Sequence, residues 1–110
     1  MVKLEPERLD LTFTALADPT RRAIVAALTT GPQTVSALAE RAPMSLVAVS
    51  KHIGVLERAG VVTRTREGRA RVCRLRPEAL REAAGWLESY RRFWTDRLDA
   101  LEHYLTEERR

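Results

Sequence analysis

The residues with the clearest potential for chemistry lie at positions 45–58, where apolar residues recur every three or four positions as in a helix. The inward face is predicted to carry Leu46, Val49, Ile53 and Leu56. The outward face is predicted to carry Val47, Ser50, Lys51, Gly54 and Arg58. Ser50 offers a hydrogen bond to a base or phosphate, Lys51 offers a cation, and Val47 can touch a thymine methyl group. The segment fits a helix that reads DNA, and an ordinary solvated helix face is the alternative.

A basic hairpin is predicted directly after this helix. β-branched residues and alternation predict strands at residues 61–66 and 70–75, joined by a turn at residues 67–69. Residues 57–76 contain two acidic residues, Glu57 and Glu67, and seven arginines. The arginines are Arg58, Arg64, Arg66, Arg69, Arg71, Arg74 and Arg76. We expect a wing that lies along phosphates or enters the minor groove, with Arg69 beside the turn glycine best placed. A charged strand edge that deters aggregation is the alternative.

Catalysis and metal binding are not expected from the other side chains. Two histidines and the single cysteine, Cys73, provide no nucleophile with a base, no thiolate metal cluster and no internal disulfide. His52 is expected to be structural and to pack near the hairpin. Asp99 and His103 share a face of the last helix, but a solvated acidic stretch is the simpler interpretation of that region. We expect no enzyme activity, no metal and no cofactor, and no redox role for Cys73.

Helix-capping residues mark the elements that must position the reading helix. Four short helices are predicted before the hairpin: residues 6–17, a second from Pro19 to the Gly31-Pro32 stop, a third from Thr34 to Ala42, and a fourth from Ser45 to about Ala59. Asp18, Thr34 and Ser45 are the expected N-caps. Gly31 and Gly60 are the expected stops, with Gly31 in a left-handed conformation.

The C-terminal third is predicted to form one helix over about residues 77–107, roughly 45 Å long. Its apolar and aromatic residues exceed what so small a domain can cover, so we expect it to pair with a second copy, together with the first helix. The predicted dimer residues are Leu9, Phe13, Leu16, Leu87, Tyr90, Trp94, Leu98, Leu101 and Leu105. The cluster of Trp86, Tyr90, Phe93 and Trp94 also fits a surface for a partner protein or a pocket for an organic effector.

Size and composition agree with a single DNA-binding domain spanning residues 1–110. The net charge of +4 favours a polyanionic partner, although arginine-rich composition also arises in GC-rich genomes. No apolar run reaches the length of a signal peptide or a membrane span, and the single cysteine fits a reducing compartment. The sequence therefore predicts a soluble cytoplasmic protein without a membrane partner.

Three segments in this order resemble the ArsR family of bacterial winged-helix repressors: ALADPTRRAI (15–24), SLVAVSKHI (45–53) and VLERAGVV (55–62). The resemblance implies a homodimer, built from the first and last helices, that represses a promoter until an effector releases it. It assigns groove reading to Val47, Ser50 and Lys51 and places Ser45 close to phosphate. Gly54 departs from the Lys or Arg common there. The third helix lacks the cysteines of the metal-sensing members.

The sequence as a whole predicts a mostly α protein with a small β-hairpin. The expected fold is a winged helix-turn-helix, with the helix-turn-helix at about 34–59, the wing at 61–76 and a dimerisation helix at 77–107. The predicted DNA contacts are Ser45, Val47, Ser50, Lys51, Arg58, Arg64, Arg66, Arg69 and Arg71. We expect a homodimeric repressor that binds double-stranded DNA at a palindromic operator, with an effector of unknown identity. A protein-interaction module and a metal-responsive repressor are the alternatives.

Overall fold

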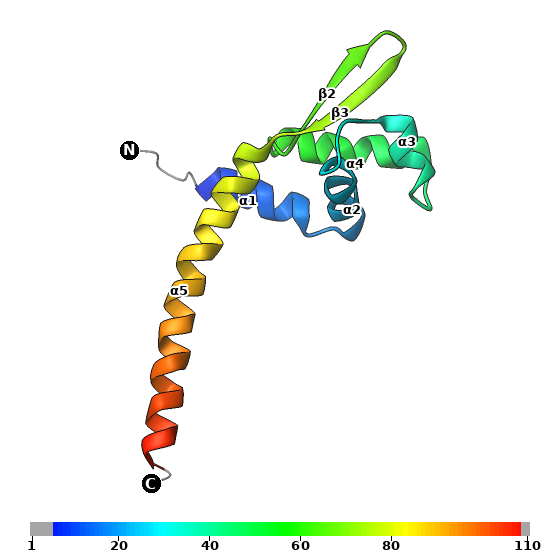
Figure 1. Ribbon diagram of the computed structural model, residues 1–110. Helices are drawn as coiled ribbons and strands as arrows, with labels where there is room; N and C mark the ends of the chain where they lie inside the picture. Colours follow the sequence, from blue (N-terminus) through cyan, green and yellow to red (C-terminus); the bar gives the residue numbers. More distant parts are fainter. Residues whose placement is uncertain (1–5, 109–110) are drawn as a thin grey trace.

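A computed structural model describes residues 6–108 as five helices and a small sheet. The elements are α1 (Pro6–Leu16), α2 (Pro19–Leu28), β1 (Gln33–Thr34), α3 (Val35–Glu40), α4 (Leu46–Arg58), β2 (Val62–Glu67), β3 (Ala70–Leu75) and α5 (Pro77–Glu108). Figure 1 shows α1 to α4 gathered beneath the β2–β3 hairpin, with α5 running away from them. The predicted fold class is confirmed, and β1 is an additional strand that sequence analysis missed.

The three predicted N-caps are confirmed by their side-chain hydrogen bonds. Asp18 accepts a hydrogen bond from the Arg21 amide at 3.0 Å, with Pro19 in the first turn of α2. The Thr34 hydroxyl accepts from the amide of Ala37 at 3.0 Å, and the Ser45 hydroxyl accepts from that of Ala48 at 3.1 Å. Each cap satisfies a backbone donor that the helix leaves free, so these residues define where α2, α3 and α4 begin.

The helix ends differ from prediction at two places. α2 ends at Leu28 with Thr29 as its C-cap, three residues before the predicted stop at Gly31, whose φ of +140° is positive as predicted. α3 ends at Glu40, two residues before the predicted Ala42. Gly60, with a φ of +76°, follows α4 as predicted and turns the chain towards β2.

The sheet has the strand order β1-β3-β2, with both pairings antiparallel. The β2–β3 turn consists of the two residues Gly68 and Arg69, because Glu67 still pairs with Ala70. Gly68 has a φ of +62°, a conformation that a two-residue hairpin turn requires and glycine adopts at little cost. The wing is therefore one residue tighter at its tip than predicted.

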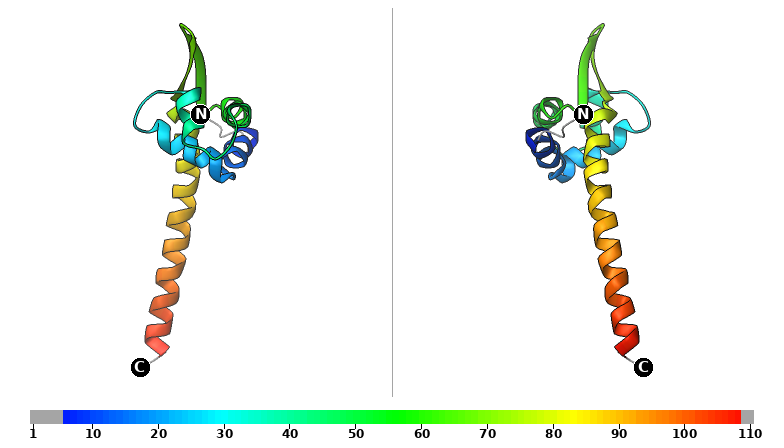
Figure 2. Two further views of the ribbon diagram at one scale, coloured as in Figure 1. Left: turned by 90° about the vertical axis from the view of Figure 1, so that its right-hand side faces the viewer. Right: turned by 90° about the vertical axis from the view of Figure 1, so that its left-hand side faces the viewer.

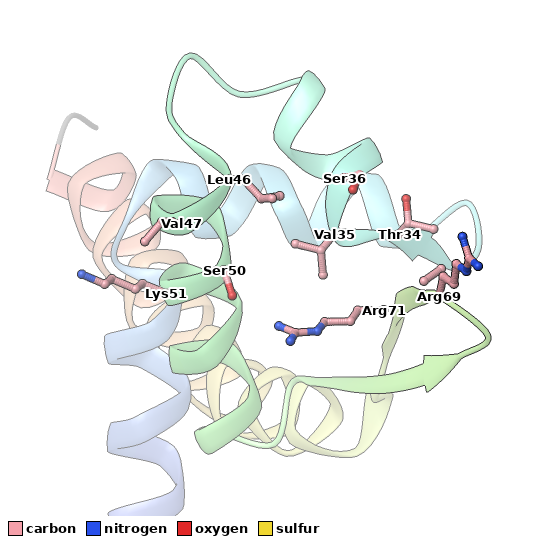
Figure 3. A pocket seen from close by; sticks show the side chains of 10 residues that line it. Thr34, Val35, Ser36, Leu46, Val47, Ser50, Lys51, Arg69 and Arg71 are labelled. Carbon is pink, nitrogen blue, oxygen red and sulfur yellow. The ribbon is translucent and has the colours of Figure 1, made fainter.

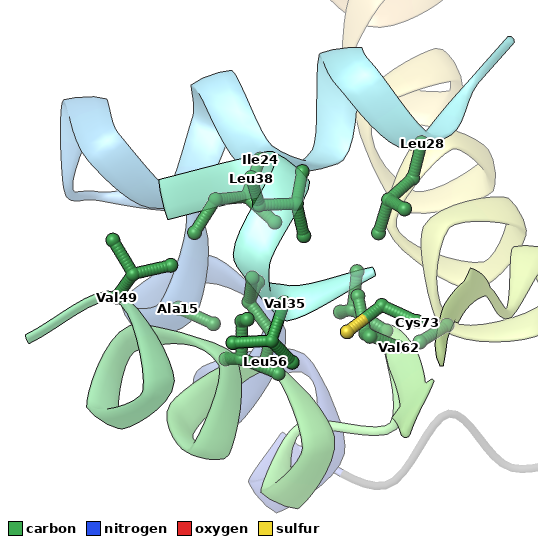
Figure 4. Packing of buried hydrophobic residues seen from close by; sticks show 12 residues of the cluster. Ala15, Ile24, Leu28, Val35, Leu38, Val49, Leu56, Val62 and Cys73 are labelled. Carbon is green, nitrogen blue, oxygen red and sulfur yellow. The ribbon is translucent and has the colours of Figure 1, made fainter. Parts of the chain in front are cut away.

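The core lies between α4, the sheet, α2 and α3 (Figure 4). Its largest fully buried side chains are Ile53, Leu56, Val49, Val61, Val62 and Cys73. Two positions of α4 differ from prediction. Leu46 is 53% exposed, because it begins the helix beyond the core, and Gly54 is buried beneath the side chains of Arg58 and Arg64.

α5 is 32 residues long, about 48 Å at 1.5 Å per residue, and most of it projects from the domain (Figures 1 and 2). Its first turns are covered, with Ala79 and Ala83 buried. α1 lies against this part through an ion pair between Arg8 and Glu82 and an edge-on contact between Phe13 and Trp86. Within residues 6–108, none of the helices has the length and apolar character needed to cross a membrane.

Candidate nucleic-acid interface

The outward face of α4 begins at the Ser45 cap and continues through its first two turns. Val47 is 64% exposed, Lys51 is exposed, and Ser50 is half-buried. Val47, Ser50 and Lys51 therefore share one side of the helix, as predicted, close to its N-terminus. Free amides and the helix dipole at that end favour contact with an anion such as a phosphate.

A groove of about 680 Å³ separates this face of α4 from the tip of the wing (Figure 3). Residues of four elements, β1, α3, α4 and β3, and of the wing turn line it: Thr34, Val35, Ser36, Leu46, Val47, Ser50, Lys51, Arg69, Ala70 and Arg71. The groove brings together five of the predicted contact residues. It is concave and carries three cationic side chains, which suits a nucleic-acid backbone.

Sequence analysis missed the roles of Thr34, Ser36 and Leu46 in this groove. Thr34 is identifiable only as a helix cap, and Ser36 as a polar residue of α3. Leu46 matches the apolar spacing of α4, which predicts the opposite orientation. The available signal was its position in the first turn, where a side chain can extend past the end of the core.

Arg64 does not occupy the position expected of a phosphate contact. Its guanidinium donates to the Ser50 hydroxyl at 2.7 Å and to Glu57 Oε1 at 2.6 Å. The Arg64 side chain is only 18% exposed, because it lies against α4. Arg64, a predicted DNA contact, is therefore engaged inside the protein and does not line the groove.

The other predicted arginines remain at the surface. Arg66 is exposed on β2 and is paired in register with Arg71 of β3. Arg58 is exposed at the C-terminal end of α4, outside the groove. On the wing, Arg74 forms an ion pair with Glu67 at 2.8 Å, and its hydrogen bond lowers the pKa of the Glu67 carboxyl group. The uncompensated charge of the wing is therefore concentrated at Arg66, Arg69 and Arg71.

His52 of α4 contacts residues at the start of α2, so its predicted location near the hairpin is wrong. Its Nδ1 atom is 3.2 Å from Arg21 Nη1 and 3.9 Å from the carboxylate of Asp18. Arg21 also donates to the carbonyl of Ala15 at 2.6 Å. This arrangement ties α4 to the α1–α2 turn, because His52 lies on the side of α4 that faces α2.

The positions considered for sensing have other contacts. His103 Nε2 lies 3.1 Å from Glu107 Oε1 on the exposed surface of α5. Across residues 6–108, no three His, Cys, Asp or Glu side chains are grouped as metal binding would require. Cys73 is buried, and burial raises the pKa of its thiol, which disfavours the reactive thiolate.

Comparisons with known proteins agree with this architecture. Residues 16–65 match the family described as a helix-turn-helix domain. The transcriptional regulator Rv2034 of Mycobacterium tuberculosis is 44% identical to this chain, over 78% of each sequence. The transcriptional repressor SdpR of Bacillus subtilis is 31% identical, over 71% of this chain and 87% of its own length.

Solved structures show the same fold at considerable sequence identity. An ArsR family transcriptional regulator superimposes with a TM-score of 0.78 at 40% identity, over 86% of this chain and 97% of the other. An ArsR-like regulator from Rhodococcus sp. RHA1 superimposes with a TM-score of 0.76 at 33% identity, over 92% and 93% of the two chains. Together with the groove between α4 and the wing, these similarities establish that the chain belongs to the ArsR family of winged helix-turn-helix, DNA-binding transcriptional regulators.

Proposed function

We propose that this protein is a homodimeric repressor that binds a palindromic operator in the cytoplasm. The observation that carries the proposal is the groove in which the outward face of α4 meets the arginines of the wing tip. A helix of this kind enters the major groove, while the hairpin beside it follows the phosphate backbone. The two surfaces therefore have the complementary roles that specific DNA binding requires.

Within this proposal, the contact residues divide into two groups. Val47, Ser50 and Lys51 read base edges near the N-terminus of α4, where Ser45 approaches a phosphate. Arg66, Arg69 and Arg71 neutralise phosphates along the wing. Base contacts set the preference among sequences, whereas phosphate contacts supply affinity that falls with added salt.

The dimer is supported by the apolar stripe of α5. Six side chains along it are about half exposed or more: Leu87, Tyr90, Trp94, Leu98, Leu101 and Leu105. Their spacing of three and four residues places them on one face, as in helices that pair. On α1, Leu9, Phe13 and Leu16 are half-buried, and Leu11, which was not predicted, is 49% exposed. A second copy that covers these surfaces would set two α4 helices about 34 Å apart, one turn of DNA.

Repression is proposed because occupying a promoter blocks transcription, and one relative, SdpR, is a repressor by name. The family resemblance adds an effector that releases the DNA.

The first test is selection of bound fragments from genomic DNA, followed by affinity measurements on the recovered site and on a shuffled duplex. We expect the recovered site to be palindromic and to bind at least about a thousandfold more tightly than the shuffled duplex, the usual range for specific recognition. Equal binding of the two duplexes would contradict the proposal.

Single substitutions then separate the two groups of contacts. Arg69→Ala is expected to weaken binding to every duplex and to lower the slope of log affinity against log salt by about one. Ser50→Ala or Lys51→Ala mainly reduces the discrimination between sequences. Arg81→Ala, which removes the same charge from an exposed site on α5, is the control and should change neither property.

The exposed stripe of α5 also favours a second candidate function, docking of a different protein. Sedimentation of the purified chain distinguishes the two. A stable dimer at micromolar concentration supports self-association. A monomer, together with no genomic fragment bound in the selection experiment, supports the protein-interaction module.

A further inference from the structure

The side chain of Arg64 connects the wing to the reading helix. It extends from β2 across α4 and donates to Ser50 Oγ at 2.7 Å and to Glu57 Oε1 at 2.6 Å. Glu57 is itself two-thirds covered, so the ion pair is largely shielded from solvent. Paired and shielded in this way, the Arg64 charge has little capacity to neutralise a phosphate.

The side chain of Arg64 passes over Gly54. Ser50, Gly54 and Glu57 are separated by four and three residues, so they lie along one face of α4. A Cβ atom at Gly54 would lie 4.0 Å from Arg64 Nη2 and 3.5 Å from Arg58 Nη1. The glycine therefore leaves a shallow surface on the helix, and the guanidinium of Arg64 lies over it between its two hydrogen-bond partners.

The contact with Arg64 restricts what the Ser50 hydroxyl can do. A serine in a helix otherwise tends to donate its proton to a backbone carbonyl of the preceding turn. Here Ser50 Oγ accepts from Arg64, and Ser50 also lines the groove. Its proton is then available to an acceptor in the groove, such as N7 or O6 of guanine, N7 of adenine or O4 of thymine.

We propose that Arg64 is a specificity-determining positioning residue that fixes the Ser50 hydroxyl as a hydrogen-bond donor to a base. Glu57 fixes Arg64 in turn, and neither residue touches the DNA. This inference rests on the proposed function, in which α4 reads an operator. It separates the wing arginines into one that orients a reading residue and others that bind phosphate.

The test uses the full chain and the operator recovered by genomic selection. Two quantities are measured for each variant: the preference at each base pair of the half-site, and the slope of log affinity against log salt. The variants are Ser50→Ala, Arg64→Met and their double mutant. Arg66→Met is the matched control, because Arg66 lies on the same strand two residues away and is exposed.

We expect Ser50→Ala and Arg64→Met to reduce the preference at the same base pair, each by about tenfold, the usual cost of one base contact. The double mutant should lose no more than either single mutant, because both disrupt the same hydrogen bond. The salt slope should stay unchanged in Arg64→Met. Arg66→Met should instead weaken binding to all sequences alike and lower the slope by about one.

The inference is overturned if Arg64→Met lowers the salt slope as Arg66→Met does, if its base preferences are unchanged, or if its loss adds to that of Ser50→Ala. Should Arg64→Met fail to fold because Glu57 is left unpaired, the double variant Glu57→Met with Arg64→Met removes both charges and gives the same readings. Absence of any base preference in the unmodified protein overturns the proposed function as well. Clear preference in the unmodified protein, with the adverse results for Arg64, overturns this inference alone.

Discussion

Arg64 and Arg66 have different surroundings although both are arginines of the same strand. Two positions apart on β2, they share a face of the strand, and alternation alone gives them equivalent roles. Their difference arises from how the hairpin packs on α4, which brings Arg64 to Ser50 and leaves Arg66 exposed. By contrast, Ser50 and Lys51 follow from helical spacing and Arg69 from the turn, so these positions in the groove were predictable.

Gly54 provides a prediction at this scale. Gly54→Ala should stabilise the protein by up to about 1 kcal/mol, because alanine favours a helix over glycine and the new methyl group makes only ordinary contacts at 3.5 and 4.0 Å. The measurement is the free energy of unfolding in urea. Gly85→Ala on α5, where nothing lies within 4 Å of the added atom, calibrates the helical contribution alone. A loss of stability for Gly54→Ala only would mean that Arg58 and Arg64 cannot accommodate the methyl group.

At the scale of elements, the starts of the helices are the most predictable features, because one side chain defines each of them. Asp18, Thr34 and Ser45 cap α2, α3 and α4 as their residue types indicate. β1 could not be recognised, since Gln33 and Thr34 are too few to show alternation and form a strand only by pairing with β3. Tertiary contact, which the local sequence does not encode, creates that element.

The Asp18 cap predicts a pH dependence of stability. The hydrogen bond from the Arg21 amide, together with the neighbouring charge of His52, lowers the pKa of Asp18 from its ordinary value of 3.8. A carboxyl group with a lower pKa in the folded state stabilises the fold above its unfolded pKa and loses this contribution as the pH falls through the folded pKa. Below pH 4, the unfolding free energy of the unmodified protein should therefore fall towards that of Asp18→Asn, which still caps the helix but does not titrate.

Urea unfolding at intervals between pH 7 and pH 2.5 measures this convergence. Asp10→Asn, an exposed position on α1, controls for the loss of one negative charge. A difference between the unmodified protein and Asp18→Asn that stays constant over the whole range would show that the cap does not depend on ionisation.

At the scale of the whole molecule, the dominant feature is how much of α5 has no covering in a single copy. The chain measures 70 × 37 × 21 Å along its principal axes, and the projecting helix accounts for the long dimension. Its length and continuous apolar spacing were predictable from sequence, because they are periodic properties of one segment. In the proposed dimer a second copy covers this stripe, and the way two copies pack together is not a periodic property of one segment.

Leu101→Lys tests self-association through α5. The substitution is expected to shift the dimer towards monomer by more than tenfold, since burying a leucine contributes about 1.5–3 kcal/mol and a symmetric pair loses two. Sedimentation equilibrium measures the shift, and circular dichroism checks that the helices remain. Asp99→Lys, on the polar side of the same helix, introduces the same side chain and should leave the dimer intact. Equal sedimentation of all three proteins would place the dimer surface elsewhere.

A single residue, Arg76, joins the wing to α5, and its amide donates to the carbonyl of Val61 at 2.7 Å. The direction in which the apolar stripe of α5 faces is therefore fixed relative to the wing, because no flexible linker separates the two. Each residue added to a helix turns it by about 100°, so an insertion after Pro77 would rotate the apolar stripe of α5 relative to the groove by that angle. The number of residues between them must therefore stay constant for both surfaces to keep their relative direction.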